Sequence, residues 1–168
     1  MNISKTAISR FSNVIFALLS LGVICVASAG AAEQGANADK EDAANKSFLN
    51  SKPANPALPF SDIVRAGNTL FMSGQIGFDS STGALAVGGF EAEAHQTMKN
   101  IKATLERYGY DMSQVVKCTV MLTDISDFAQ FNTIYTQYFK PPYPARSAFA
   151  VKALALNSLL EVECIAHL

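Results

Sequence analysis

Two short stretches carry the charged residues on which the expected function depends. They are Pro-Ala-Arg-Ser at 144–147 and Leu-Glu-Val-Glu at 160–163. These stretches place Arg146 and Glu161 on apolar, strand-like segments, where an unpartnered charge is costly. A planar guanidinium grips a carboxylate through two parallel hydrogen bonds. A glutamate in a partly dry cleft can orient and deprotonate a water molecule. The pair therefore suits hydrolysis of a small molecule that carries its own carboxylate; the alternative is a structural ion pair between strands or subunits.

Around this stretch, the hydrophobic pattern predicts a single α+β domain over residues 58–168. The expected elements are, in chain order, strands near 63–64 and 69–76, a helix over 90–108, a strand over 115–122, a helix between Asp124 and Pro141, and strands near 146–152 and 159–167. This order predicts a mixed, mainly antiparallel sheet with two helices on one face. If the other face is apolar, self-association would cover it.

The helix expected over 90–108 has one apolar face and one solvated face. Its apolar residues recur at steps of four and three, the period of a single helical face: Ala94, Met98, Ile101, Leu105 and Tyr108. Glu91, Glu93 and Glu106 lie among basic residues on the face expected to be solvated, and we assign them no function. His95 lies outside the apolar stripe, so we expect it to be exposed rather than catalytic.

The expected strands also set a distance between the two charges. If the last two strands form a hairpin that turns near 156–157, Arg146 lies opposite His167. Six residues at about 3.3 Å each then leave roughly 20 Å between Arg146 and Glu161 within one chain. On this hypothesis, a working pair is completed across a subunit interface.

The N-terminal part of the chain has the pattern of a secretory signal peptide over residues 1–29. Two basic residues precede an apolar run at 14–27, which is short for a membrane-spanning helix. Small residues predict cleavage after Ala29, so we expect a periplasmic or secreted protein; a retained membrane anchor is the alternative. Residues 30–57 have no apolar period, and we expect a flexible leader.

Charge is nearly balanced, with 13 Lys and Arg against 14 Asp and Glu. Cleavage after Ala29 would leave 11 basic and 14 acidic residues, a net charge of −3. The sequence contains no run of basic residues. This composition argues against binding of nucleic acid through phosphate contacts.

Two cysteines, Cys118 and Cys164, follow the expected cleavage site. An oxidising compartment permits a disulfide between them. The sequence alone does not show that their Cα atoms lie close enough to be bridged. We therefore expect two buried thiols that act as small apolar side chains. The sequence has no CxxC motif and only two histidines, so we expect no metal site.

Several motifs in the same order resemble the signature of the RidA family, the reactive intermediate deaminases, which are also called YjgF. The main ones are Pro-Ala-Arg-Ser-x-Phe at 144–149 and Leu-Glu-Val at 160–162. Other similar segments are 70–76, 100–103, 115–117 and 122–135. The resemblance covers about residues 58–168.

The resemblance implies a chorismate-mutase-like fold, assembled as a homotrimer with clefts between subunits. It implies hydrolysis of reactive 2-imino or enamino acids to 2-keto acids and ammonia without a cofactor, as in a 2-iminobutanoate/2-iminopropanoate deaminase. Carried over position by position, it implies that Arg146 binds the substrate carboxylate and that Glu161 activates the water. The implied substrate-binding positions are Phe60, Ser73, Gly74, Asn132 and Ala148.

Two of these positions depart from the family pattern. Phe60 stands where many active members have a tyrosine whose hydroxyl points into the cleft. Losing one neutral hydrogen bond costs about 0.5–1.5 kcal/mol, so we expect weakened or shifted activity rather than none. Ala148 stands where many members have a cysteine whose backbone helps to hold the water, so the missing thiol is not expected to matter.

The alternative function is a non-catalytic module that binds a small carboxylate, or a holdase-like protein outside the cytoplasm. Binding a carboxylate requires Arg146 but not a water-activating Glu161, so the presence of both favours catalysis. Some members of the family have been described as ribonucleases or translation inhibitors. The net charge of −3 and the expected export disfavour that third function.

Overall fold

The computed structural model describes residues 45–50 and 58–168. The expected signal peptide at 1–29 and most of the expected leader lie outside the described residues. Within the described part of the chain, no helix is both long enough and apolar enough to cross a membrane.

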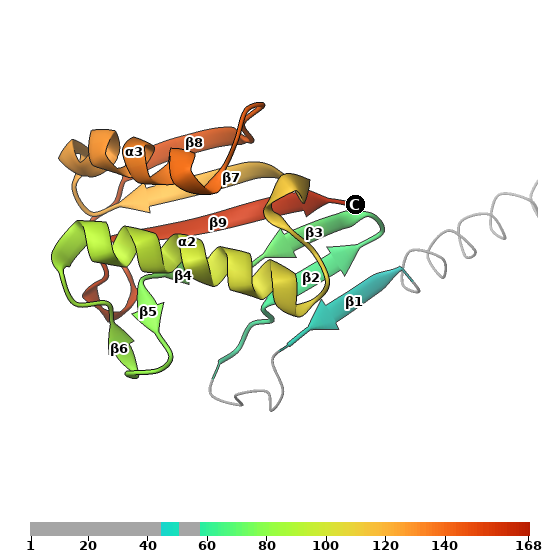
Figure 1. Ribbon diagram of the computed structural model, residues 1–168. Coiled ribbons are helices and arrows are strands. Elements are labelled where there is room, and N and C mark those ends of the chain that lie inside the picture. The colour runs from blue at the N-terminus through green and yellow to red at the C-terminus, as the bar shows by residue number, and fades with distance from the viewer. Residues whose placement is uncertain (1–44, 51–57) are drawn as a thin grey trace, which may run out of the picture. The chain divides into compact units, whose positions relative to one another are not determined.

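The described strands form one large sheet and a small two-stranded ribbon (Figure 1). The large sheet has the order β1-β2-β3-β9-β7-β8, with β4 paired to β9 beyond the end of β3. Its strands are β1 (Lys46–Leu49), β2 (Ile63–Ala66), β3 (Thr69–Met72), β4 (Gln75–Ile76), β7 (Val115–Leu122), β8 (Ala145–Ala150) and β9 (Leu160–His167). Among the described strands of this sheet, only β7 and β8 run parallel; the other pairs are antiparallel. The prediction of a mixed, mainly antiparallel sheet is confirmed.

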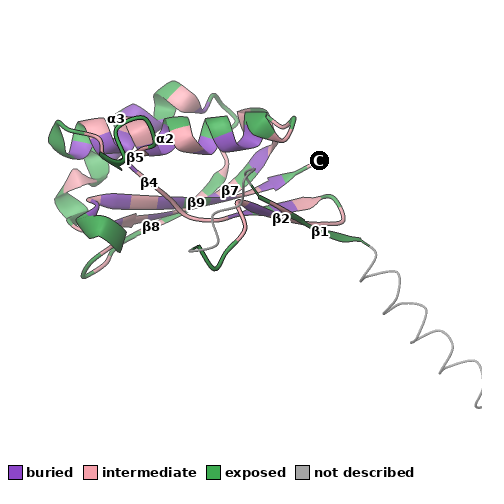
Figure 2. Cartoon of the chain, turned by 90° about the horizontal axis from the view of Figure 1, so that it is seen from below, coloured by how far each residue is buried: buried purple, intermediate pink, exposed green. Residues whose placement is uncertain are grey.

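Two helices, α2 (Gly89–Arg107) and α3 (Phe128–Tyr138), lie on the same face of this sheet (Figure 2). The expected bounds of α2 are met within a residue at each end, and Gly109 follows it with a φ of +81°, the left-handed conformation that glycine adopts readily after a helix. The ribbon of β5 (Phe78–Asp79) and β6 (Ala84–Leu85) leads into α2. The α+β class with two helices on one face is therefore confirmed.

The core lies between the helices and the sheet. The apolar stripe predicted for α2 is buried at Ala94, Met98, Ile101 and Leu105, none of them more than 1% exposed. The sheet and α3 meet this stripe with Leu70, Val120, Leu122, Phe131 and Val162, all at 0% exposure. The helical and strand periods in the sequence thus select the residues that are buried.

The last two strands do not form the expected hairpin. β7 lies between them, parallel to β8 on one side and antiparallel to β9 on the other. Residues 151–159 carry the chain across β7, a distance of two strand spacings or about 10 Å. The expected pairing of Arg146 with His167 is therefore wrong, because Arg146 lies beside Cys118, and His167 pairs with Thr69.

Three smaller expectations also differ from the structure. The interval 30–57, expected to be a flexible leader, contains β1, which pairs with β2 along the edge of the sheet. The strand expected over 69–76 is broken into β3 and β4 at Ser73 and Gly74. Glu93, assigned to the solvated face of α2, is only 7% exposed, because its carboxylate accepts the backbone N–H of Leu159.

Cys118 and Cys164 form a disulfide, so the expectation of two free thiols is wrong. The two residues are directly paired across β7 and β9, and their Cα atoms are 4.1 Å apart. Their exposures are 0% and 2%. The strand register, which local sequence patterns do not encode, is what brings them together.

Reduction of this disulfide should destabilise the fold. A bond that closes a loop of 46 residues restricts the unfolded chain by about 4 kcal/mol in the chain-entropy account, and measured effects are typically about 2–4 kcal/mol. We expect a reductant to lower the free energy of unfolding by that amount in urea titrations. The double variant Cys118→Ala/Cys164→Ala should be about as stable as the reduced protein and should not respond to reductant. Equal stability of the oxidised and reduced wild type would contradict this prediction.

Candidate functional site

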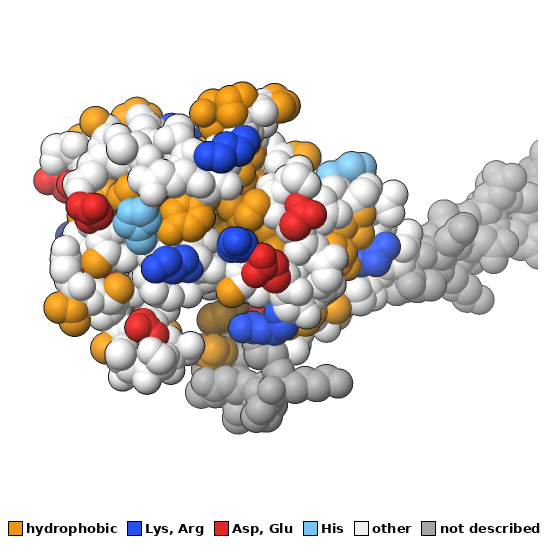
Figure 3. Space-filling model, in the orientation of Figure 1, with side chains coloured by type: hydrophobic (Ala, Val, Ile, Leu, Met, Phe, Trp, Pro, Cys, Tyr) orange, Lys and Arg blue, Asp and Glu red, His pale blue; other side chains and the backbone are white. Residues whose placement is uncertain are grey.

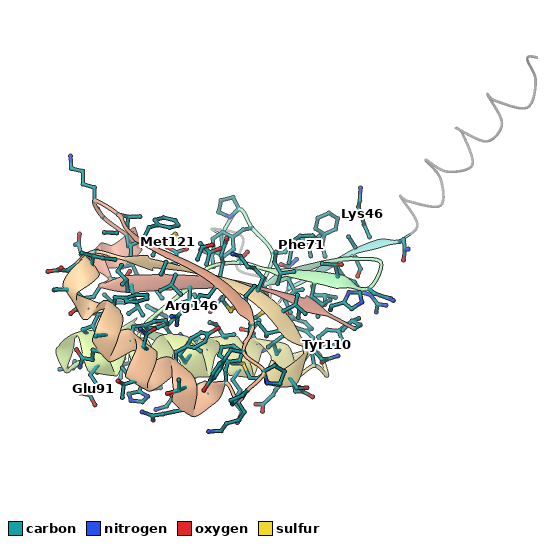
Figure 4. The ribbon with its side chains drawn as sticks, turned by 90° about the horizontal axis from the view of Figure 1, so that it is seen from above. Lys46, Phe71, Glu91, Tyr110, Met121 and Arg146 are labelled. Atoms are coloured by element: carbon teal, nitrogen blue, oxygen red, sulfur yellow. A yellow bond between two sulfur atoms is a disulfide. The ribbon has the colours of Figure 1, made fainter. Side chains whose placement is uncertain are left out.

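Arg146 lies on β8 with its side chain between the sheet and α3 (Figure 4). Its guanidinium donates a hydrogen bond of 2.5 Å to Oδ1 of Asn132. The Cζ atom is 4.6 Å from the ring centroid of Tyr135 and 5.4 Å from that of Phe128. These three helix residues are spaced at four and three, so α3 turns one face toward the arginine. Aromatic rings and one neutral amide thus orient the guanidinium.

The guanidinium keeps its capacity for an anion. It has five N–H donors, of which Asn132 accepts one. No carboxylate among the described residues forms an ion pair with it. Arg146 opens into a cavity of about 290 Å³, whose other lining residues are Asn132, Tyr135, Thr136, Tyr143 and Pro144. This cavity, the arginine-side cavity below, is suited to a small carboxylate.

Glu161 lies in a second cavity of about 320 Å³, the glutamate-side cavity, whose other lining residues are Phe60, Ser73, Gly74, Ile76 and Ala155. On β9, Glu161 pairs with Ile76 of β4. A Cβ atom on residue 74 would overlap the Glu161 carboxylate, so Gly74 leaves the space that this carboxylate occupies. The break between β3 and β4 thus makes room for the carboxylate.

Ser73 fixes the rim of the glutamate-side cavity. Its hydroxyl donates to the carbonyl of Ser61 at 2.6 Å, and its backbone N–H donates to the carbonyl of Asp62 at 3.1 Å. Asp62 in turn accepts a hydrogen bond of 2.8 Å from the hydroxyl of Tyr108 at the end of α2. The segment that carries Phe60 is therefore held beside Gly74.

The environment of Glu161 disfavours its charged form. Burial, and secondly the negative charge of Glu163 two residues along the same strand face, raise the pKa of the Glu161 carboxyl above its ordinary value. In the described part of the chain, no donor forms a hydrogen bond to this carboxylate that would offset those effects. A glutamate in this state is a better proton acceptor than one in water.

The two charges lie on opposite faces of the sheet. Arg146 is in register with Cys118 on the face that the helices cover. Glu161 is in register with Met121, three residues further along β7; an odd step along a strand reverses the face. Figure 4 shows Met121 on the side of the sheet away from Arg146 and the helices. A structural ion pair between Arg146 and Glu161 within one chain is therefore excluded.

Of the seven residues expected at the site, the structure brings six into two separate groups. Phe60, Ser73 and Gly74 join Glu161, and Asn132 joins Arg146. Ala148 lines neither cavity; it lies on β8 in register with Val120 on the helix side.

Sequence reasoning missed Thr136, Tyr143, Ile76, Ala155 and Tyr135 as lining residues. Nothing in their local sequence marks them as residues that line a cavity. His95 is half-buried rather than exposed, with Nδ1 3.0 Å from the hydroxyl oxygen of Tyr138, and it lines neither cavity.

Two further features bear on what the site could bind. On the helix-bearing face, basic and acidic side chains are interspersed rather than gathered by sign (Figure 3), unlike a phosphate-binding surface. Within residues 45–50 and 58–168, no group of three His, Cys, Asp or Glu side chains is placed to hold a metal ion.

Residues 50–168 match the protein family described as Endoribonuclease L-PSP. The chain belongs to this family. It is the RidA family to which the motifs around Arg146 and Glu161 point. The structure has the fold of solved RidA proteins: it is similar to RidA from an Antarctic Psychrobacter, with a TM-score of 0.67 at 40% identity, covering 73% of this chain and 99% of that one.

Some of the curated relatives are named as enzymes. The human 2-iminobutanoate/2-iminopropanoate deaminase is 47% identical over 64% of this chain and 79% of that protein. The chloroplastic Reactive Intermediate Deaminase A of Arabidopsis thaliana is 42% identical over 73% of this chain and 66% of that protein. The structure of TdcF from E. coli, which contains bound serine, is 32% identical with a TM-score of 0.66, covering 73% of this chain and 99% of that one.

Proposed function

We propose that this RidA-family protein hydrolyses 2-imino or enamino acids to 2-keto acids and ammonia, with Arg146 binding the substrate carboxylate and Glu161 activating the water. The environment of Arg146 carries the proposal: a half-buried guanidinium, oriented by Asn132 and aromatic rings, opens into a cavity and has no carboxylate partner among the described residues. The relatives named as deaminases support the same class of reaction here.

In the proposed reaction, a water oxygen bonds to the imine carbon while Glu161 takes one of the water protons. The electron pair of the C=N double bond moves to the nitrogen, which takes the proton back from Glu161 and so returns that group to its carboxylate form. In the resulting carbinolamine, a second proton passes from the hydroxyl to the nitrogen, the C–N bond breaks, and ammonia leaves as the hydroxyl oxygen becomes the keto oxygen. The raised pKa of Glu161 favours the first proton transfer. The proposal uses no cofactor.

The proposal includes a homotrimer in which Arg146 of one subunit faces Glu161 of the next. Its support is that the two charges lie in separate cavities on opposite faces of one sheet, so neither cavity alone holds both groups. The face without helices also exposes large apolar side chains, with Phe71 at 47% and Phe149 at 46%. Such a surface favours association with other subunits.

The proposal also includes export. It is supported by the signal-peptide pattern at 1–29 and by the buried disulfide, since disulfides persist in oxidising compartments and are rare in the cytosol.

Imine hydrolysis is the direct test of the function. An amino-acid oxidase would generate the imine in situ, and semicarbazide would trap what remains. We expect the protein to accelerate imine loss, and Arg146→Ala to lower kcat/KM at least about tenfold because a charge-assisted contact with the carboxylate is lost. The rate should fall as pH drops through the raised pKa of Glu161, since the protonated acid cannot accept a proton.

Arg65→Ala is the matched control for that experiment. Arg65 lies on β2, lines neither cavity and donates to the carbonyl of Gly67, so its removal should leave the rate unchanged. A folded wild type that binds small carboxylates but accelerates no imine would reject the enzyme and favour the binding module.

Mixing two inactive variants tests the shared cleft. Arg146→Ala and Glu161→Ala subunits each lack one group, and random exchange in a cyclic trimer restores both groups in about a quarter of the clefts. We therefore expect roughly that fraction of wild-type activity after exchange, measured by imine loss. If exchange is demonstrated with labelled subunits and no activity returns, the two residues do not work across an interface.

Export predicts a shortened chain. N-terminal sequencing of the protein from its native cell should begin at Gly30, because the small residues before it favour cleavage after Ala29. A full-length chain recovered from the cytoplasm with reduced cysteines would contradict export.

A further inference from the structure

Glu93 is a buried carboxylate that lines neither cavity, and the proposed reaction gives it no role. It lies in the second turn of α2 and is 7% exposed. A carboxylate in such a place is costly unless it accepts hydrogen bonds. Its burial therefore indicates a specific structural contact.

That contact is with the backbone at the start of β9. Oε2 of Glu93 accepts the N–H of Leu159 at 2.9 Å. The carbonyl oxygen of Leu159 accepts both the backbone N–H and the hydroxyl of Thr123, at 3.0 and 3.1 Å. Both polar backbone groups of Leu159 are thus fixed, one by α2 and the other by the residue that follows β7. Glu161 comes two residues later.

Glu93 also packs against Gly77, the residue that follows β4. A Cβ atom on residue 77 would lie 2.7 Å from both Cα and Cβ of Glu93, so the glycine there packs directly on the helix. Gly77 follows Ile76, which pairs with Glu161. Further along α2, Asn100 donates to the carbonyl of Ile76 at 2.9 Å. One side of α2 therefore touches both segments that frame the Glu161 carboxylate.

We propose that Glu93 is a positioning residue for Glu161: its carboxylate holds the entry to β9 through Leu159 and thereby sets where the Glu161 side chain enters the glutamate-side cavity. The inference rests on the proposed role of Glu161 in activating the water, and it adds Glu93 of α2 as the residue that positions Glu161. Misplacing a reacting group by about 1 Å can cost about 100-fold in rate. The chemical step, rather than substrate binding by Arg146, should therefore respond to changes at Glu93.

Three substitutions separate hydrogen bonding from charge. Glu93→Gln keeps an acceptor oxygen at the same reach, and we expect kcat for imine hydrolysis within about twofold of wild type. Glu93→Ala removes the acceptor, and we expect kcat to fall about tenfold or more with little change in KM. Glu93→Asp keeps the charge but shortens the side chain by one methylene group, so it should resemble the alanine variant and replaces it if that variant fails to fold.

Glu106→Ala is the matched control. This carboxylate is on the same helix, its side chain is 56% exposed, and it forms an ion pair with Lys102 one turn away. Its removal should leave kcat and KM unchanged.

A second readout does not depend on activity. Amide hydrogen exchange at Leu159 should accelerate, and the carboxyl carbon resonance of Glu161 should shift, in Glu93→Ala and Glu93→Asp but not in Glu93→Gln. If both changes occur in these variants while the wild type hydrolyses no imine, the proposed function is rejected and the contact between Glu93 and β9 stands. The proposal is overturned if folded Glu93→Ala or Glu93→Asp keeps the wild-type kcat and Glu161 resonance, or if Glu93→Gln is impaired as strongly as either of them.

Discussion

The pairing of β7 on both of its edges is the constraint on which the rest of the structure depends. β9 runs antiparallel along one edge and β8 parallel along the other. The register places Arg146 beside Cys118 and Glu161 beside Met121. Positions 118 and 121 differ by an odd number of residues, so the two charged side chains must leave the sheet on opposite faces. The same register joins Cys118 to Cys164.

This separation has an energetic consequence for the arginine. A guanidinium paired with a carboxylate of its own chain would have satisfied its charge and lost much of its attraction for an anionic ligand. Arg146 instead has partial compensation from the rings of Tyr135 and Phe128 and from the amide of Asn132. These contacts reduce the cost of partial burial without neutralising the charge. The arginine is thus oriented by its own chain and still able to bind a carboxylate.

The sequence predicts what local periodicity encodes and misses what strand pairing decides. The bounds of β7 and, within a residue, of α2 follow from alternation and from the helical period. The order of β8, β7 and β9 depends on pairing between distant segments, and periodicity does not report it. The disulfide was missed for the same reason, since it depends on register. β1 was missed because four residues with only two apolar side chains give too short a pattern.

The same distinction between predicted and missed features holds for the residues of the candidate site. Arg146 and Glu161 stand out because charges on apolar strands are unusual, and their motifs carry a family resemblance. The residues around them, such as Tyr143 and Ala155, have nothing in their local sequence to mark them. Glu93 was misassigned because its burial depends on one backbone N–H that lies 66 residues further along the chain.

Glu93 and Glu161 show how hydrogen bonding distinguishes two carboxylates that are both withdrawn from water. The Glu93 carboxylate accepts a backbone N–H, which fixes its position and ties α2 to β9. The Glu161 carboxylate has no such donor within the described residues; burial and the charge of Glu163 raise its pKa. A carboxylate whose lone pairs are engaged by the backbone is suited to hold a strand in place. One whose lone pairs are free, beside a glycine that leaves it room, is suited to take a proton from water. In the proposed reaction, the bonded glutamate is therefore the support and the unbonded one is the proton acceptor.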